Sequence, residues 1–283
     1  MLLIEFRNHF VKSLMDEYPR SEITAFYRRL IDFYFQWPPT YSILNPKYHL
    51  KKEELHQLTS ALNELKKFRP IQYILKESHF YGRIFYVDER VLIPRTETED
   101  LVKWVLNDFN DKEDQFNVLE LGTGSGCIAI CLAKEQKKCN IEALEVSKAA
   151  LQVARKNAKL HDVAIDFIHK DMTRLERWSK PLDVIISNPP YIEPDEKKEM
   201  LPNVLDHEPH LALFTPKKEP LYYYKKIIVM ANRSLNLNGC LYLEINPKYK
   251  DELVTFIKTL TFKDIELRND IFGKSRMLKA VKS

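Results

Sequence analysis

A four-residue loop that could hold a planar amino group follows a short strand-like run. Residues 183–187 are mainly β-branched and apolar, which predicts a buried strand of a parallel sheet. Asn188, Pro189, Pro190 and Tyr191 come next, and the two prolines fix the backbone as it leaves the carboxyl edge, where open α/β sheets bind ligands. The carboxamide, a backbone carbonyl and the ring suit an –NH2 group. The alternative is a Pro-Pro turn in which Asn188 bonds locally.

A glycine-rich turn lies upstream of this loop. The apolar run 118–121 enters the pattern G-x-G-x-G over residues 122–126, and a helical pattern follows. Glycines let the backbone approach a ligand at a helix N-terminus, but the spacing matches neither the dinucleotide fingerprint nor the P-loop. Glu120 would repel a pyrophosphate and could attract an ammonium or sulfonium group. Glu145 ends the next apolar run and can accept both hydroxyls of a ribose.

The wider pattern predicts an α/β protein with a Rossmann-like, doubly wound and mostly parallel sheet, because strand-like runs alternate with helical patterns. Residues 1–75 lack glycine and show helical spacing, and the aromatic segment 79–93 fits a β-hairpin. Thr96 and Glu99 have the spacing of a capping box. The strands are expected at 118–121, 141–145, 165–168, 183–187 and 239–245, with 262–267 and 277–281 as a closing hairpin.

The composition of the chain argues against a membrane-spanning protein, a secreted protein and a metal-binding protein. The chain has 283 residues, a formal net charge of +4 and no apolar run of membrane-spanning length. Early charges at the amino terminus argue against a signal peptide. Cys127 and Cys131, one helical turn apart, are interpreted as core residues, and the absence of a C-x-x-C pair indicates a reducing, cytoplasmic setting. His207 and His210 flank Pro209, which breaks any helix aligning them, so no metal site is expected.

These residues resemble the release-factor glutamine methyltransferases of the HemK/PrmC type. That family methylates the side-chain nitrogen of the glutamine in the Gly-Gly-Gln motif of peptide-chain release factors. The resemblance implies an N-terminal helical domain at 1–75 that docks the substrate, a β-hairpin linker at 76–95 and a class I S-adenosylmethionine-dependent methyltransferase domain at 96–283. It rests on the stretches 72–74, 80–82, 91–95, 97–99, 120–126, 188–191, 206–209, 212–213 and 243–245.

The resemblance also implies which residues bind the methyl donor S-adenosylmethionine and its product S-adenosylhomocysteine. Glu145 is expected to accept the ribose hydroxyls, and Asn188 to touch the donor as well as the substrate. Asp171 and Met172 match the position beside the adenine, although Asp171 could instead cap a helix. The backbone cradle is formed by Gly122, Thr123, Gly124, Ser125 and Gly126.

The chemistry at the substrate follows from the weakness of an amide nitrogen as a nucleophile, since its lone pair is delocalised into the carbonyl. The Asn188 side-chain oxygen and the Pro189 carbonyl are expected to accept both amide protons and to stabilise positive charge building on the nitrogen. Pro190 should stiffen the loop, and Tyr191 should pack against the substrate amide. Glu244, at the end of a strand, either lines the pocket or is solvated. Neither a metal nor a covalent nucleophile is required.

The same resemblance indicates the partners of this chain and leaves alternative substrates open. We expect a monomer that modifies release factors, without a membrane or direct nucleic-acid partner. A ribosomal-protein glutamine is an alternative substrate, and DNA or RNA amino groups are another, although the first 75 residues show no concentrated basic stripe. The chain departs from the family pattern at Lys76, Thr96 and Asn246, where glycine, proline and glycine are common, and none of these changes removes a group needed for chemistry.

Overall fold

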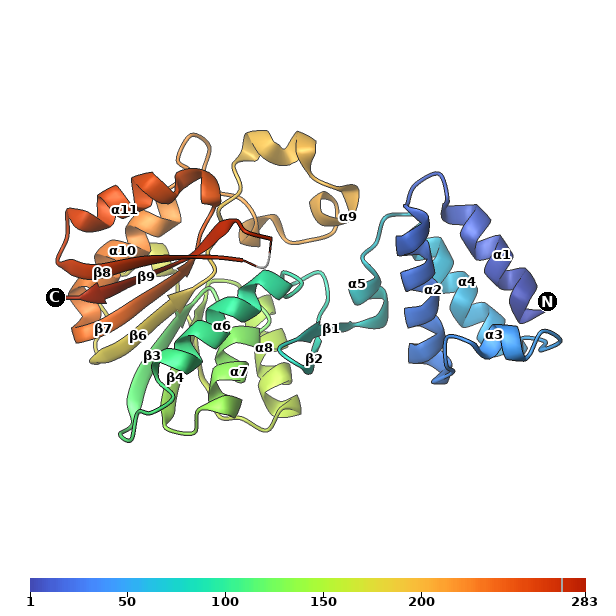
Figure 1. Ribbon diagram of the computed structural model, residues 1–283, viewed down its shortest axis with the longest axis horizontal. Coiled ribbons are helices and arrows are strands. Elements are labelled where there is room, and N and C mark those ends of the chain that lie inside the picture. Colours follow the sequence, from blue (N-terminus) through green and yellow to red (C-terminus); the bar gives the residue numbers. More distant parts are fainter. Residues whose placement is uncertain (271) are drawn as a thin grey trace. The chain divides into compact units, whose positions relative to one another are not determined.

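The computed structural model describes residues 1–270 and 272–283, which form two compact units (Figure 1). The helical unit comprises residues 1–76 and 201–207, and the sheet unit comprises 77–200 and 208–283. The hairpin that the sequence predicts therefore belongs to the sheet unit. No helix among the described residues is both long and apolar enough to cross a membrane.

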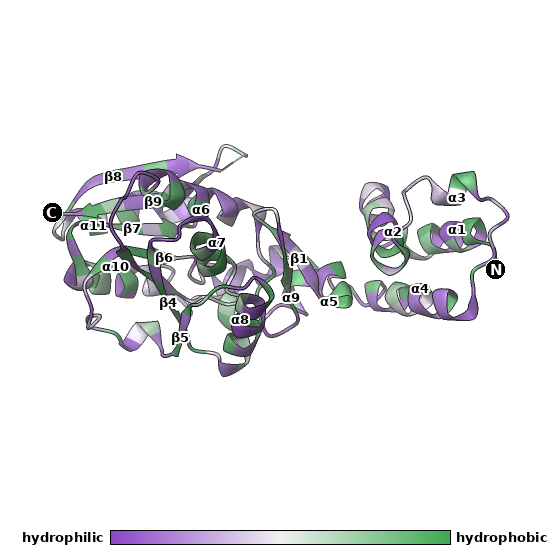
Figure 2. Cartoon of the chain, turned by 90° about the horizontal axis from the view of Figure 1, so that it is seen from below, coloured by the Kyte–Doolittle hydropathy of each residue, from purple (hydrophilic) through white to green (hydrophobic). Residues whose placement is uncertain are grey.

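The helical unit confirms the helical spacing of the first 75 residues. Leu3, Phe6, Phe10 and Leu14 are at most 1% exposed and form one face of the first helix. Hydrophobic and hydrophilic residues alternate along these helices, as an amphipathic bundle requires (Figure 2). The helices are α1 (Leu3–Leu14), α2 (Arg20–Phe35), α3 (Tyr41–Leu44), α4 (Lys52–Leu65), α5 (Ile71–Leu75) and α9 (Pro202–Leu205).

Lys76 ends α5 in a left-handed conformation, with a φ of 59°. A glycine adopts this conformation without steric cost, whereas a side chain with a Cβ does not. The family preference for glycine at this position is therefore explained by the backbone, and lysine is tolerated there with some strain.

The sheet unit contains the predicted doubly wound sheet. Its strand order is β5-β4-β3-β6-β7-β9-β8, in which the first five strands are parallel and β9 runs antiparallel to both of its neighbours. A separate antiparallel hairpin pairs β1 (Glu77–Phe80) with β2 (Arg83–Tyr86). The strands of the sheet are β3 (Phe116–Leu121), β4 (Cys139–Glu145), β5 (Asp166–His169), β6 (Leu182–Ser187), β7 (Leu235–Glu244), β8 (Phe262–Asn269) and β9 (Ser275–Lys282).

Helices cover both faces of the sheet because successive strand residues point to opposite sides. Val118 and Val184 pack on α6 (Thr96–Asp108), α7 (Cys127–Glu135) and α8 (Lys148–Leu160). Leu119 and Ile185 pack on α10 (Tyr222–Ser234) and α11 (Lys250–Lys258). Cys127 and Cys131 lie in the first of these cores, as predicted. Short 3-10 helices connect the strands: η1 (Met172–Arg174), η2 (Pro194–Glu199), η3 (His210–Ala212) and η4 (Pro247–Tyr249).

The predicted capping box at the start of α6 is wrong. Thr96 is the first helical residue, is exposed, and the residue before it makes no side-chain cap. Glu99 instead accepts a hydrogen bond from the Tyr81 backbone N–H at 2.9 Å, so its carboxylate ties the hairpin to the helix. Thr96 thus stands at the position where proline is common in helices, which accounts for this departure from the family pattern.

Candidate active site

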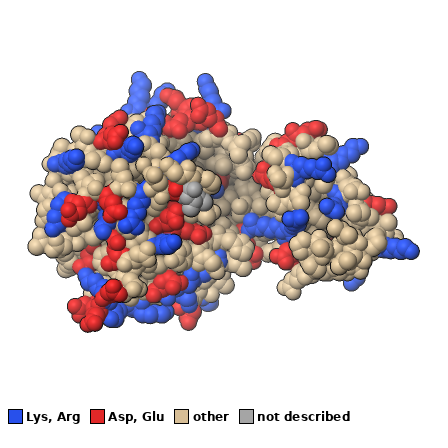
Figure 3. Space-filling model, viewed as in Figure 1, with Lys and Arg blue, Asp and Glu red and all other residues tan. Residues whose placement is uncertain are grey.

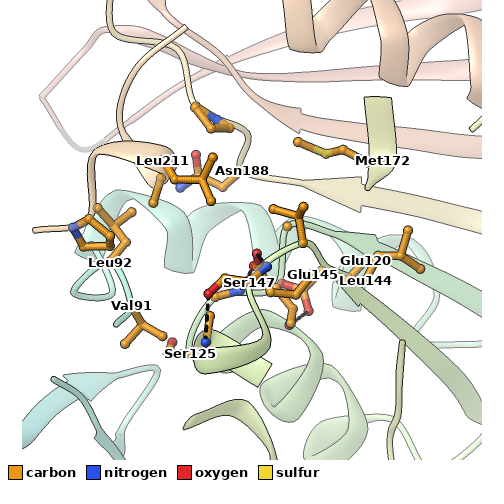
Figure 4. Close-up of a pocket in the computed structure, with 18 of the residues that line it drawn as sticks. Val91, Leu92, Glu120, Ser125, Leu144, Glu145, Ser147, Met172, Asn188 and Leu211 are labelled. Carbon is orange, nitrogen blue, oxygen red and sulfur yellow. Dashed lines mark hydrogen bonds between the residues drawn. The ribbon is translucent and has the colours of Figure 1, made fainter. Parts of the chain in front are cut away.

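A cavity of about 370 Å³ lies at the carboxyl edge of the parallel strands, within the sheet unit (Figure 4). This volume is in the range of small-molecule sites. Three of the residues predicted from the sequence, Gly126, Pro189 and Tyr191, are not among those that line it. The predicted residues that do line it are Gly122, Thr123, Gly124, Ser125, Glu145, Asp171, Met172, Asn188 and Pro190.

The strand register brings these residues to one level. Leu121 pairs with Leu144 on one side and with Ser187 on the other, and Ser187 pairs with Leu243. The next residues along these strands therefore lie in a row at the carboxyl edge, in the order Glu145, Gly122, Asn188 and Glu244. The glycine turn and the Asn188 loop, which are far apart in the sequence, thus become neighbours at the cavity.

The glycine turn presents bare backbone to the cavity. No heavy atom lies within 4 Å of where a Cβ would be at Gly124, so this face of the turn is open. Gly126 is closed instead: a Cβ there would lie 3.1 Å from the Ile130 side chain and 3.3 Å from the Ala154 Cβ, and its φ is 83°. Gly126 therefore lets α7 begin in close contact with α8, and it is not among the residues that line the cavity.

Glu120 is a buried carboxyl directly below the turn, 1% exposed. Its Oε2 accepts hydrogen bonds from the Thr123 hydroxyl at 2.6 Å and from the Ala129 backbone N–H at 3.2 Å. Burial raises the pKa of Glu120 to about 8, and these two hydrogen bonds oppose that shift. A cationic group of a ligand beside it would favour the ionised form.

Glu145 holds the turn in place. Its two carboxylate oxygens accept hydrogen bonds from the backbone N–H groups of Gly124 at 3.0 Å and Ser147 at 2.9 Å. Each oxygen retains a second lone pair, so the carboxylate can still accept two hydroxyl groups from the cavity.

Asp171 combines the two roles that the sequence left open. Its Oδ1 caps η1 by accepting hydrogen bonds from the backbone N–H and hydroxyl of Thr173, at 2.8 and 2.7 Å. The residue also lines the cavity together with Met172. Helix capping therefore orients the carboxylate without removing it from the pocket wall.

The Asn188 loop is held by buried polar groups. The Asn188 Nδ2 donates to the Thr98 hydroxyl at 3.1 Å, and Pro189 is buried. The Tyr191 hydroxyl donates to Glu244 at 3.0 Å, while Glu244 is 1% exposed and does not line the cavity. Glu244 is therefore neither of the two things that the sequence suggested: it supports the loop from behind.

Two further features line the cavity: a pair of tyrosines that the sequence did not assign to it, and Arg95, which the sequence placed either at the entrance of the site or at a simple helix start. Tyr222 and Tyr223 face it from the start of α10, whereas Tyr224 is fully buried. Arg95 forms an ion pair with the buried Glu208 at 2.6 Å, which also accepts a hydrogen bond from the Ile93 backbone N–H at 3.1 Å. The run of three consecutive tyrosines in the sequence could have indicated that Tyr222 and Tyr223 line the cavity. No local pattern indicates the ion pair between Arg95 and Glu208, since 113 residues separate them.

Histidines, cysteines and acidic residues do not converge at this site. Among residues 1–270 and 272–283, no three of them lie close enough together to hold a metal ion. The polar groups that line the cavity are carboxylates, hydroxyls, cationic side chains, backbone groups and the Asn188 amide.

Known proteins resemble this chain along its whole length. Residues 5–75 match the PrmC N-terminal domain family, and residues 100–210 match the Methyltransferase small domain family. The release factor glutamine methyltransferase of Flavobacterium psychrophilum is 42% identical over 281 residues, which cover 99% of each chain. The one of Streptococcus pneumoniae is 38% identical over 283 residues and 98% of each chain. A methyltransferase structure from Pyrococcus furiosus shares the fold, with a TM-score of 0.51 at 16% identity over 82% of this chain and 98% of that one.

Replacing Glu120 by glutamine should change how stability depends on pH. Because the folded-state pKa is raised from 4.5 to about 8, the carboxyl stabilises the fold fully below the lower value, and this contribution is lost as the pH rises through the higher one. Relative to Glu120→Gln, the wild-type free energy of unfolding should fall between about pH 4.5 and pH 8, by at most about 1.4 kcal/mol per pH unit. Urea unfolding across this range measures the difference, and parallel pH profiles would contradict it.

Proposed function

This chain belongs to the release factor glutamine methyltransferase family, and we propose that it transfers a methyl group from S-adenosylmethionine to the glutamine side-chain nitrogen in the Gly-Gly-Gln motif of peptide-chain release factors. The observation that carries this proposal is the Asn188 amide, which lines the cavity with its Nδ2 already engaged by Thr98. The Oδ1 atom is thereby left as the acceptor for an amino group.

The residues of the cavity fit S-adenosylmethionine. Its positive charge matches the buried Glu120 carboxyl, its ribose hydroxyls match the remaining lone pairs of Glu145, and its adenine amine matches Asp171, with Met172 beside the ring. The open backbone at Gly124 lets the ligand approach the turn closely. When bound, S-adenosylmethionine supplies an electrophilic methyl group and leaves as S-adenosylhomocysteine.

On the substrate side, the loop after β6 orients the amide. Asn188 Oδ1 and the Pro189 carbonyl accept the two amide protons, hold the nitrogen toward the methyl group and stabilise the positive charge that develops on it. Since the product nitrogen keeps one proton, the other passes to solvent. Pro190 lines the cavity and limits the motion of the loop. Tyr191, whose hydroxyl is bound by Glu244, would contact the substrate amide through its ring.

We also propose that the enzyme acts as a cytoplasmic monomer without nucleic acid. Free cysteines are consistent with a reducing compartment, and all four are of this kind. Basic and acidic side chains are interspersed on the face shown in Figure 3, in both units, which does not favour a nucleic-acid surface there.

A labelling experiment tests the proposed function. The purified chain is incubated with methyl-labelled S-adenosylmethionine and, in separate reactions, with release factors, ribosomal subunits, DNA and RNA. We expect label on the release factor, located by mass spectrometry at the glutamine of Gly-Gly-Gln, and none on a release factor in which that glutamine is alanine. Label on a ribosomal protein or a nucleic acid, with none on release factors, would overturn the proposal.

Asn188→Ala should separate catalysis from donor binding. Removing the amide acceptor should lower turnover by roughly 10²- to 10³-fold, because the amide is no longer oriented in the transition state. The dissociation constant for S-adenosylhomocysteine, measured by calorimetry, should change little, since the turn and Glu145 are intact. Asn110→Ala, at an exposed position in the same unit, is the matched control. Near-normal methylation by Asn188→Ala would show that the assigned role is wrong.

The helical unit is proposed to dock the protein substrate, because its core is separate from that of the sheet unit and contributes no residue to the cavity. Deleting residues 1–70 should therefore raise the KM for a release factor much more than it weakens donor binding. A short Gly-Gly-Gln peptide offers nothing for a docking unit to hold, so its methylation should be affected least. Equal losses for protein, peptide and donor would contradict a docking role.

A further inference from the structure

A chain of buried hydrogen bonds runs behind the Asn188 loop. Asn188 Nδ2 lies 3.1 Å from the Thr98 Oγ1, and this hydroxyl lies 2.6 Å from Glu244 Oε2. The other carboxylate oxygen of Glu244 lies 3.0 Å from the Tyr191 hydroxyl, which lies 3.3 Å from Arg276 Nη1. Thr98 and Glu244 are 3% and 1% exposed, and Thr98 also lines the cavity. Four elements far apart in the sequence meet here.

Arg276 sets the direction of the hydrogen bonds at the far end of this series. Arg276 is a donor only, and its Nε is held by the buried Asp270 at 2.9 Å. The Tyr191 hydroxyl accepts from Arg276, so its single proton is free to go to Glu244. With Glu244 ionised, the form that the nearby Arg276 charge and the two hydroxyl donors favour, the carboxylate receives a hydrogen bond on Oε1 and accepts a second one on Oε2.

The direction of these hydrogen bonds determines how the side-chain amide of Asn188 is oriented. Thr98 has one hydroxyl proton, and donating it to Glu244 leaves Oγ1 able only to accept. The side-chain amide of Asn188 must then turn its NH2 toward Thr98, which directs Oδ1 away from Thr98. With the amide rotated by half a turn, Oδ1 would face the Thr98 oxygen with no proton between them. The two amide orientations are therefore unequal in energy.

We propose that Thr98 and Glu244 are positioning residues for methyl transfer, which set the side-chain amide of Asn188 so that its Oδ1 accepts a proton of the substrate amino group. This inference rests on the proposed function for the identity of the substrate. Neither residue need touch the reacting atoms. Their effect is to prevent the amide from presenting a donor where an acceptor is required.

Threonine and valine have nearly the same shape, so Thr98→Val removes the hydroxyl with little change in packing. We expect kcat to fall roughly 10- to 100-fold, while the KM for the release factor and the affinity for S-adenosylhomocysteine change less than about twofold. Thr98→Ser restores the hydroxyl and should recover most of kcat. Thr215→Val is the matched control: Thr215 is also buried in this unit, but its hydroxyl is only 3.4 Å from a backbone carbonyl outside the chain of hydrogen bonds. It should retain wild-type kcat.

A second measurement does not depend on the substrate. In protein labelled with ¹⁵N-asparagine, the Asn188 side-chain signal is assigned by its loss in Asn188→Ala. The Nδ2 proton that faces Thr98 should exchange with water at least about tenfold faster in Thr98→Val than in the wild type or in Thr215→Val. Glu244→Gln, which replaces a double acceptor by a group with its own N–H donors, should have the same effect. It also provides a second variant should Thr98→Val fold poorly.

The outcomes separate this inference from the proposed function. If the wild type methylates release factors but Thr98→Val has normal kcat and unchanged amide exchange, the positioning role is wrong and the function stands. If Thr98→Val loses thermal stability and donor affinity in proportion to kcat, the hydroxyl is merely structural, and the inference is overturned as well. If the wild type labels no release factor, the proposed function fails, and the exchange rates alone decide whether Thr98 orients Asn188.

Discussion

The reversal of strand order at β3 is the constraint on which the site depends. β3 pairs with β4 on one side and with β6 on the other, so the connections that follow β3 and β6 turn away from each other and leave a crevice between them. Because Leu121 and Ser187 are in register, the glycine turn and the Asn188 loop begin at the same level of this crevice. A methyl donor on one side and an amide on the other would meet there without any long loop having to close.

Buried carboxyls give the site its electrostatic character. Glu120 and Glu244 are almost fully buried. Both accept hydrogen bonds from hydroxyl groups, and neither forms a direct ion pair with a basic side chain among the described residues. Burial raises the pKa of both groups, whereas hydrogen bonds to their oxygens oppose the shift. Glu120 faces the cavity, where a positively charged ligand would complete its neutralisation. Glu244 faces the protein, and its hydrogen bonds orient other side chains.

Local sequence was sufficient for the parts of the site that local chemistry controls. The β-branched runs predicted the strands, and the spacing of glycines before an apolar helix predicted the turn, because each pattern reports on the backbone of its own segment. Contacts between distant segments were not predictable in this way. Thr98 and Glu244 are 146 residues apart, and Glu99 was misread as a helix cap because its partner in the hairpin, Tyr81, carries no local signal. Tyr222 and Tyr223 were not assigned to the cavity, because helical spacing in this segment indicates only which residues, such as the buried Tyr224, face the core.

The two halves of the site depend on different amounts of the fold. The donor cradle is built by β3, β4 and the start of α7, whose interactions are with near neighbours in the sequence. The orientation of Asn188 additionally involves α6, the end of β7 and Arg276 on β9, the antiparallel strand between β7 and β8. The glycine turn and Glu145 are therefore held within a local supersecondary unit, while the Asn188 amide is held by groups from distant parts of the sheet unit.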